Sequence, residues 1–423
     1  LGLGDGSDSD VSALDDDDEF GGAVSLNSGG DRLAVGASGD DGAGNAASDT
    51  GAAYLFSFTD TNFNNGTLES TIGSGYTGGK NVDVTNLDNG DLFGSAVSLN
   101  AAGDRLAVGA VGDDGAGNAA NVSGSAYLFS FTDTDFNGAT LKSTIGSGYN
   151  TDSDNVDVMN LDDADDFGKS VSLNSAGDRL AVGAPGDDGA GTMSDNTGAA
   201  YLFSFTDTNF NSGILESTVG KGYTGGKNVD VANLDDIDLF GSSVSLNGIG
   251  DRLAVGAGQD DGSDITTNNA GAAYLFSFSD TDFNSGNLAS TIGKGYTATN
   301  DVNVDDLGIG DLFGSSVSLN DAGDRLAIGA RRDAGANNDA FEAGATYLFS
   351  FTDTDFNSGI LESIIGKGYT GGKKLDVTNL DNGDKFGNSI SLNGVGDRLV
   401  IGAAGDDGAD SNAPDTGAAF LFS

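Results

Sequence analysis

The chain has 423 residues and a formal net charge of −47, with 65 acidic against 18 basic side chains. It lacks Cys, His and Trp, which excludes disulfides, thiolate or imidazole metal sites and histidine-based acid–base catalysis. So acidic a surface repels nucleic acid and anionic membranes, and no apolar run approaches the roughly 20 residues that span a bilayer.

One sequence pattern recurs along the chain. It begins with Phe-Gly and returns every 73 or 74 residues, so that six repeats start near Phe20, Phe93, Phe167, Phe240, Phe313 and Phe386. All but five of the acidic residues are Asp, and 70 residues are Gly. Asp and Gly favour tight turns, whereas acidic helices favour Glu. The repeats therefore predict short strands joined by turns.

Each repeat contains four predicted strands, which in the first repeat cover residues 23–27, 32–37, 52–58 and 68–72. In the third strand, Tyr54 and Phe56 point to one side and Ala53 and Leu55 to the other. Both faces are apolar, so both should be buried. The pattern predicts an all-β fold, a six-bladed β-propeller of six four-stranded repeats that forms a single domain over residues 1–423. A linear solenoid is the alternative.

The turn between the third and fourth strands reads FTDTNFNNG or FTDTDFNSG. We expect its second Phe to fill the base of the hairpin, with Asp and Thr forming hydrogen bonds within the turn. These residues are Phe63, Phe136, Phe210, Phe283 and Phe356.

Phe-Gly before the first strand and Gly-Ala after the second together resemble the FG-GAP repeat, which builds the propellers of integrin alpha subunits and of many bacterial surface proteins. The third repeat keeps the full signature, Phe167-Gly168 and Gly183-Ala184-Pro185. The resemblance implies a propeller at a microbial cell surface or outside the cell. Calcium-binding members carry a DxDxDG-like loop between the first two strands. Here that turn is short, as at residues 27–32, so the family's calcium ligands have no counterpart.

An arginine recurs at the end of this short turn. We expect it to stabilise the structure by bonding to a nearby Asp or carbonyl. Its six copies are Arg32, Arg105, Arg179, Arg252, Arg325 and Arg398.

The sixth repeat stops after its third strand, at Ser423, and residues 1–19 precede the first Phe-Gly. Val11 and Leu14 align with Val84 and Leu87 of the next linker. We expect residues 1–19 to serve as an N-terminal latch and linker, with Leu1–Gly4 beside the third strand of the sixth repeat, which closes the ring. Pairing with another copy would instead give a head-to-tail polymer. A third possibility is that the chain is cut from a longer repetitive protein whose leader is not visible.

Paired Asp residues lie in the loops after the second strand. With Gly beside them, they could surround a hard cation such as calcium, or they could cap turns and remain solvated. The candidate ligands are Asp40, Asp41, Asp113, Asp114, Asp187, Asp188, Asp260, Asp261, Asp406 and Asp407. Arg331 and Arg332 interrupt the acidic pattern in the fifth repeat and could give the disc a polarity in stacking or binding.

Every candidate group recurs five or six times, whereas an active site is normally unique. The sequence therefore predicts a non-enzymatic structural or adhesive unit, the protomer of a surface filament or a segment of a large adhesin. Its partners would be further copies of itself or a surface glycan or protein, and its only cofactor would be calcium. The alternatives are a calcium-dependent module that recognises glycan or protein, and a carboxylate-based hydrolase.

Overall fold

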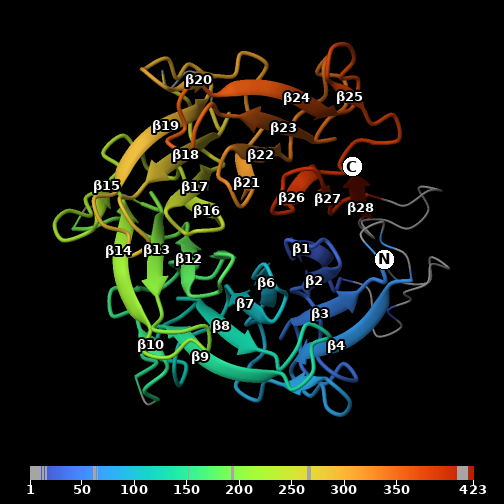
Figure 1. Cartoon of the computed structure of the whole chain (residues 1–423), viewed down its shortest axis with the longest axis vertical. Coiled ribbons are helices and arrows are strands. Elements are labelled where there is room, and N and C mark those ends of the chain that lie inside the picture. The colour runs from blue at the N-terminus through green and yellow to red at the C-terminus, as the bar shows by residue number, and fades with distance from the viewer. Residues whose placement is uncertain are drawn as a thin grey trace.

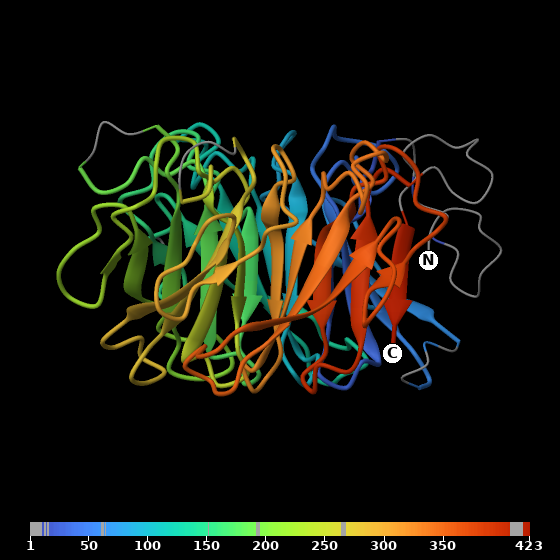
Figure 2. The ribbon, with the colours of Figure 1, turned by 90° about the horizontal axis from the view of Figure 1, so that it is seen from above.

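A computed structural model describes residues 11, 14, 17–60, 63, 65–150, 152–191, 195–263, 268–406 and 418–423. The described residues form six sheets, or blades, around a central axis, and the main strands of each blade are antiparallel (Figure 1). Seen from the side, the strands run between the two faces of a disc (Figure 2). These residues contain no helix, and hence none that could cross a membrane. The prediction of an all-β six-bladed propeller is confirmed, and the solenoid is excluded.

The strands repeat in the same order from the axis outward. The innermost strands are β1 (Phe20–Leu26), β6 (Phe93–Leu99), β11 (Ser170–Leu173), β16 (Phe240–Leu246), β21 (Phe313–Leu319) and β26 (Phe386–Leu392). The second strands are β2 (Arg32–Ala37), β7 (Arg105–Ala110), β12 (Arg179–Ala184), β17 (Arg252–Ala257), β22 (Arg325–Ala330) and β27 (Leu399–Ala403). The third strands are β3 (Ala52–Ser57), β8 (Ser125–Ser130), β13 (Ala199–Ser204), β18 (Ala272–Ser277), β23 (Ala345–Ser350) and β28 (Ala418–Phe422).

The outer strands occur in the first five blades. The fourth strands are β4 (Thr67–Gly73), β9 (Thr140–Gly146), β14 (Ile214–Gly220), β19 (Asn287–Gly293) and β24 (Ile360–Gly366). Each is followed by a two-residue strand that runs parallel to it: β5 (Val82–Asp83), β10 (Val156–Asp157), β15 (Val229–Asp230), β20 (Val302–Asn303) and β25 (Leu375–Asp376). Among the described residues, the sheet of the sixth blade has three strands.

The short fifth strand adds to the four that the sequence predicts. The chain turns back after β14, where the N–H of Gly222 donates to the Asp230 carboxylate (2.8 Å), and Val229 then pairs with Val219. Two residues are too few to show the period-2 alternation by which a strand is identified in a sequence.

The third strands of the first five blades are largely buried on both faces, as the apolar pattern predicts, whereas β28 of the sixth blade is partly exposed. In β13, Tyr201, Leu202 and Phe203 have no accessible surface. They pack between neighbouring blades, so most of each hydrophobic core lies between two sheets.

The Phe-Gly and Gly-Ala positions meet where adjacent blades touch. Gly256 of β17 lies so close to Gly314 of the next blade that a Cβ at Gly256 would be 1.9 Å from the Gly314 carbonyl oxygen. Phe313 forms an isolated β-bridge with Gly271 of the preceding blade. Its side chain is fully buried, and its ring lies edge-on to that of Tyr347, with 5.3 Å between the ring centroids. The repeated dipeptides are therefore contact points between two backbones.

A ring of hydrogen bonds joins the innermost strands. In each blade the N–H of the strand's Leu donates to a Ser hydroxyl oxygen of the preceding blade. The pairs are Leu99–Ser25, Leu173–Ser98, Leu246–Ser172, Leu319–Ser245 and Leu392–Ser318 at 2.9 Å, and Leu26–Ser391 at 3.2 Å. The last pair joins the first blade to the sixth. Leu1–Gly4 lies outside the described residues, so its role as a latch stays a prediction.

We expect Gly256→Ala to destabilise the fold by about 2–3 kcal/mol, because the new methyl group would overlap the Gly314 backbone. Gly258→Ala is the matched control, since a Cβ there would be 3.7 Å from its nearest neighbour. Urea unfolding of both variants measures the difference. Equal stabilities would contradict the account of the blade contact.

Candidate functional site

The loops after the second strands and the linkers that lead into the next blade lie together on one face of the disc, which we call the acidic face. The linker before β6 contacts the loops of two blades. Its Gly90 N–H donates to the Ser48 carbonyl (3.1 Å), and the Gly112 N–H donates to the Asp91 carbonyl (3.0 Å). The acidic face is thus one connected surface.

The first Asp of each predicted pair lies beneath this surface. In the third blade, the Asp187 carboxylate accepts hydrogen bonds from the hydroxyls of Tyr201 (2.5 Å) and Tyr223 (2.8 Å) and from the N–H of Gly189 (2.7 Å). Asp187 is buried, and burial raises the pKa of its carboxyl. The same group recurs as Asp40–Tyr54–Tyr76, Asp113–Tyr127–Tyr149, Asp260–Tyr274–Tyr296 and Asp333–Tyr347–Tyr369.

The second Asp of each pair closes its own loop by accepting a backbone N–H eight residues further on. The bonds join Asp41 to Asp49, Asp114 to Val122, Asp188 to Asn196 and Asp261 to Asn269, at 2.7–2.9 Å. In the sixth blade Asp406 is buried, and Phe420 stands where the other blades have the first Tyr. Asp407 lies outside the described residues.

Each linker contributes a further buried Asp. Asp165 accepts the N–H of Asp162 (2.8 Å), and burial, together with the nearby charge of Asp187, raises the pKa of Asp165 to about 7. Burial likewise raises the pKa to about 7 for Asp91, Asp238 and Asp311.

A cavity of about 280 Å³ opens on the acidic face of the second blade. Asp91, Asp113, Asp114, Asn118 and Tyr149 contribute to its lining. These oxygen donors are of the type that calcium prefers. In the part of the chain that the structure describes, however, no three acidic side chains converge closely enough to hold a metal ion. Calcium binding by the candidate aspartates stays a prediction.

The candidate ligands predicted from the sequence did not include the tyrosines, the buried linker aspartates or Asp333. The tyrosines recur at two fixed positions in five repeats, and that regularity was the available signal. Asp333 follows Arg331 and Arg332, which obscure its alignment with the other aspartates. Arg332 pairs with Glu342 of the same loop at 3.3 Å.

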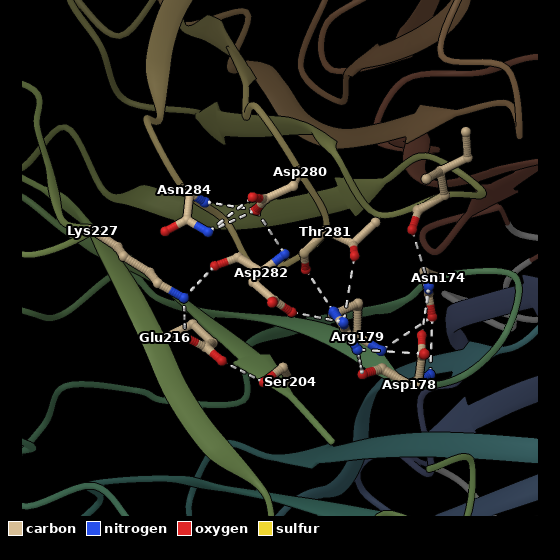
Figure 3. Close-up of polar contacts among 11 residues, drawn as sticks. Asn174, Asp178, Arg179, Ser204, Glu216, Lys227, Asp280, Thr281, Asp282 and Asn284 are labelled. Carbon is tan, nitrogen blue, oxygen red and sulfur yellow. Dashed lines mark hydrogen bonds and ion pairs between the residues drawn. The ribbon is translucent and has the colours of Figure 1, made fainter. Parts of the chain in front are cut away.

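The recurring arginine connects blades on the opposite face, as Figure 3 shows for Arg179. Its Nε donates to the Thr281 carbonyl (2.5 Å) and its Nη2 to the Asp282 carboxylate (2.9 Å), both in the hairpin of the next blade. Its Nη1 donates to the carbonyl of Asp178 (2.8 Å). The predicted structural role of the arginine is thereby confirmed for Arg179, and Arg32, Arg105 and Arg252 contact the next hairpin in the same way.

Two more residues complete what we call the hairpin-binding site of a blade, which in the third blade is Arg179, Lys227 and Val229. Lys227 pairs with Glu216 and donates to the Asp282 carbonyl at 2.7 Å (Figure 3). Val229 lies against Gly286 of the bound hairpin. A Cβ added at Gly286 would be 2.5 Å from the Val229 side chain.

The second Phe of the hairpin is buried in four blades, as predicted for Phe136, Phe210, Phe283 and Phe356, whereas Phe63 is partly buried. Phe210 has no accessible surface and meets Phe205 edge-on at 5.2 Å. Its φ of 61° is unusual for a residue other than Gly, so the hairpin backbone has a defined shape.

We expect the thermal midpoint to fall as the pH rises from about 5 to about 8. A buried Asp whose pKa is raised to about 7 in the folded state contributes stability that is complete below its unfolded pKa of about 3.9 and is lost as the pH rises through 7. Asp165→Asn should reduce this slope, because it removes the titrating carboxyl. The amide oxygen can still accept the Asp162 N–H, so the loop keeps its hydrogen bond.

The matched control is Asp236→Asn, at an exposed position in the next linker, which should leave the slope unchanged. Melting curves at constant ionic strength measure both. A midpoint that rises over this range, or identical slopes for the two variants, would contradict the assignment.

We expect Arg179→Ala to destabilise the protein by about 2 kcal/mol, because it removes charge-assisted hydrogen bonds to the next hairpin. Arg325→Ala should change stability little, since the equivalent side chain is 48% exposed and bonds only within its own turn among the described residues. Chemical unfolding of both variants tests this, and equal losses would refute it.

Comparison with known proteins agrees with this geometry. Four segments match the model of the FG-GAP repeat: residues 86–129, 161–203, 234–276 and 374–422. Each runs from a linker through the Phe-Gly and Gly-Ala contacts to a third strand. A search of curated protein sequences found no match. FG-GAP propellers are generally non-catalytic, and these repeats are typical of extracellular and surface proteins. The chain is therefore a six-bladed β-propeller in which four segments match the FG-GAP repeat.

Proposed function

We propose that this propeller is a non-enzymatic structural or adhesive unit at a microbial cell surface, the protomer of a surface filament or a segment of a large adhesin. One observation carries the proposal. The distinctive side-chain groups recur from blade to blade, and the described copies bond to the protein itself. The Asp–Tyr–Tyr groups join a loop to its blade, and the arginines join blades to one another.

The composition supports the same role. The chain lacks His and Cys, and the buried first Asp of the described loops is held by tyrosine hydroxyls and a backbone N–H, as Asp187 is, which suits a structural role. A net charge of −47 keeps such units apart in solution, so a specific contact is needed to join them.

Electron microscopy of native surface material, with and without a calcium chelator, tests this proposal. We expect filaments or ordered arrays built from discs. Isolated discs in both conditions would contradict the structural role. Arrays that dissociate only with the chelator would assign the contacts to calcium.

A calcium-dependent module that recognises glycan or protein is the second candidate, and the cavity beside Asp91, Asp113 and Asp114 favours it. Burial is the main cause of the raised pKa of Asp91, and the nearby charge of Asp113 adds to it; a bound cation would offset that charge.

Calcium titration of chelator-treated protein tests the second candidate. A ligand at about 100 times its Kd would stabilise the fold by about 2.7 kcal/mol. We therefore expect a higher thermal midpoint with calcium than with magnesium at equal ionic strength. No difference up to about 10 mM would exclude even a weak extracellular type of calcium site.

A further inference from the structure

We propose that the propeller binds one hard cation on its axis, in a polar cavity on the face opposite the acidic face, with the carboxylate of Asp321 beside it. The site lies away from the acidic face, so the inference goes beyond the proposed function and does not depend on it. A cavity, a ring of serine hydroxyls and a single acidic side chain carry it.

The cavity lies where the innermost strands end. Its volume is about 90 Å³, which is room for several water molecules or for a partly hydrated cation. All six blades line it, each through the end of its innermost strand and the turn that follows; in the fifth blade these residues are Ser318, Leu319 and Asp321. Because the blades converge there around the axis (Figure 1), a ligand in this cavity would lie between all six repeats.

Serine hydroxyls line this cavity. Five serines of the hydrogen-bonded ring between the innermost strands contribute, and each is more than nine-tenths buried: Ser25, Ser172, Ser245, Ser318 and Ser391. A hydroxyl oxygen has two lone pairs, and the N–H of a Leu in the next blade occupies one of them. Among the described residues no second donor reaches these oxygens, so each retains a lone pair for a ligand.

One acidic side chain interrupts the repeat beside these serines. The residue after the turn's Asn is, in blade order, Ser28, Ala101, Ser175, Gly248, Asp321 and Gly394. The Asp321 carboxylate accepts hydrogen bonds from the hydroxyls of Ser28 (3.1 Å) and Ser175 (2.9 Å). Those serines belong to the first and third blades, which are two places from the fifth on either side. The carboxylate therefore reaches to the axis.

The turns of the adjacent blades leave space for this carboxylate and hold its backbone. A Cβ added at Gly394 would overlap the Asp321 carboxylate, and one added at Gly248 would be 2.9 Å from the Asp321 Cβ. The Asp321 N–H donates to the Gly394 carbonyl (3.0 Å), and the Gly248 N–H donates to the Asp321 carbonyl (3.0 Å). Asp321 is thus fixed between two glycines, at the edge of the cavity.

Charge and ligand chemistry decide what the cavity binds. Asp321 is the one charged residue among the described residues that line it, and the whole molecule carries a net charge of −47. An anion would be repelled by both, whereas a cation is attracted by both. The side-chain groups on offer are hydroxyl, amide and carboxylate oxygens, which bind hard cations in preference to softer transition metals.

The test compares cations by thermal melting of the full, chelator-treated chain. Tetramethylammonium chloride holds the ionic strength constant and sets the baseline, because this bulky cation makes no short contacts to oxygen ligands. Sodium, potassium, magnesium and calcium chlorides then replace part of it in turn. We expect at least one of these salts to raise the thermal midpoint with a saturable dependence on concentration, as a ligand of the folded state does. The effective salt identifies the cation.

Asp321→Ser is the variant that tests the site, because Ser occupies the same position in two other repeats, as Ser28 and Ser175. We expect affinity for the effective cation to fall about tenfold, since the charge beside the cavity is lost. Asp321→Asn should give the same loss while its amide oxygen still accepts both serine hydroxyls. Asp236→Asn, exposed in a linker, removes the same charge elsewhere and should leave the affinity unchanged. Circular dichroism checks that each variant is folded.

Equal midpoints in all five salts would overturn the inference. A cation effect that survives both Asp321 variants would also overturn it, and would favour calcium binding on the acidic face instead. Equal losses in Asp321→Ser and Asp236→Asn would attribute the effect to net charge and reject the axial site. Isolated discs in electron microscopy would contradict the structural role alone, because this site does not require assembly.

Discussion

The close approach of two backbones between adjacent blades is the constraint on which the rest of the structure depends. Gly256 and Gly314 can approach so closely only because neither carries a side chain. That proximity places Phe313 in the core between two blades, edge-on to Tyr347, and brings each innermost strand within reach of a serine of the blade before it. The hydrophobic cores, the serine–leucine ring and the arginine contacts all require the spacing that these glycines allow.

The fold could be predicted from the sequence because the same strand and turn pattern recurs in six repeats. Phe-Gly and Gly-Ala recur at constant spacing, and residues such as Leu202 and Tyr201 alternate in a strand that is apolar on both faces. The hairpin Phe was also predictable, since Phe210 meets Phe205 only five positions away. Local patterns of this kind can be recognised in a sequence without a structure.

The candidate site was less predictable because its bonds join distant residues. Tyr201 and Tyr223 reach Asp187 across 14 and 36 positions, and Arg179 reaches Thr281 across 102. Repetition shows that such residues recur but not which of them meet. A buried Asp held by two tyrosines and a solvated Asp on a calcium loop have the same sequence signature, and burial distinguishes them. The exposure of Arg325 is likewise invisible in the repeat, where it matches the other five arginines.

The described arginine contacts run the same way around the ring, from one blade to the hairpin of the next. The second, third and fourth blades therefore each supply a basic side chain to one neighbour and a hairpin to the other. Such a blade is held by two chemically different contacts on its two sides. The ring consequently has a direction, although the strands of the blades are nearly the same.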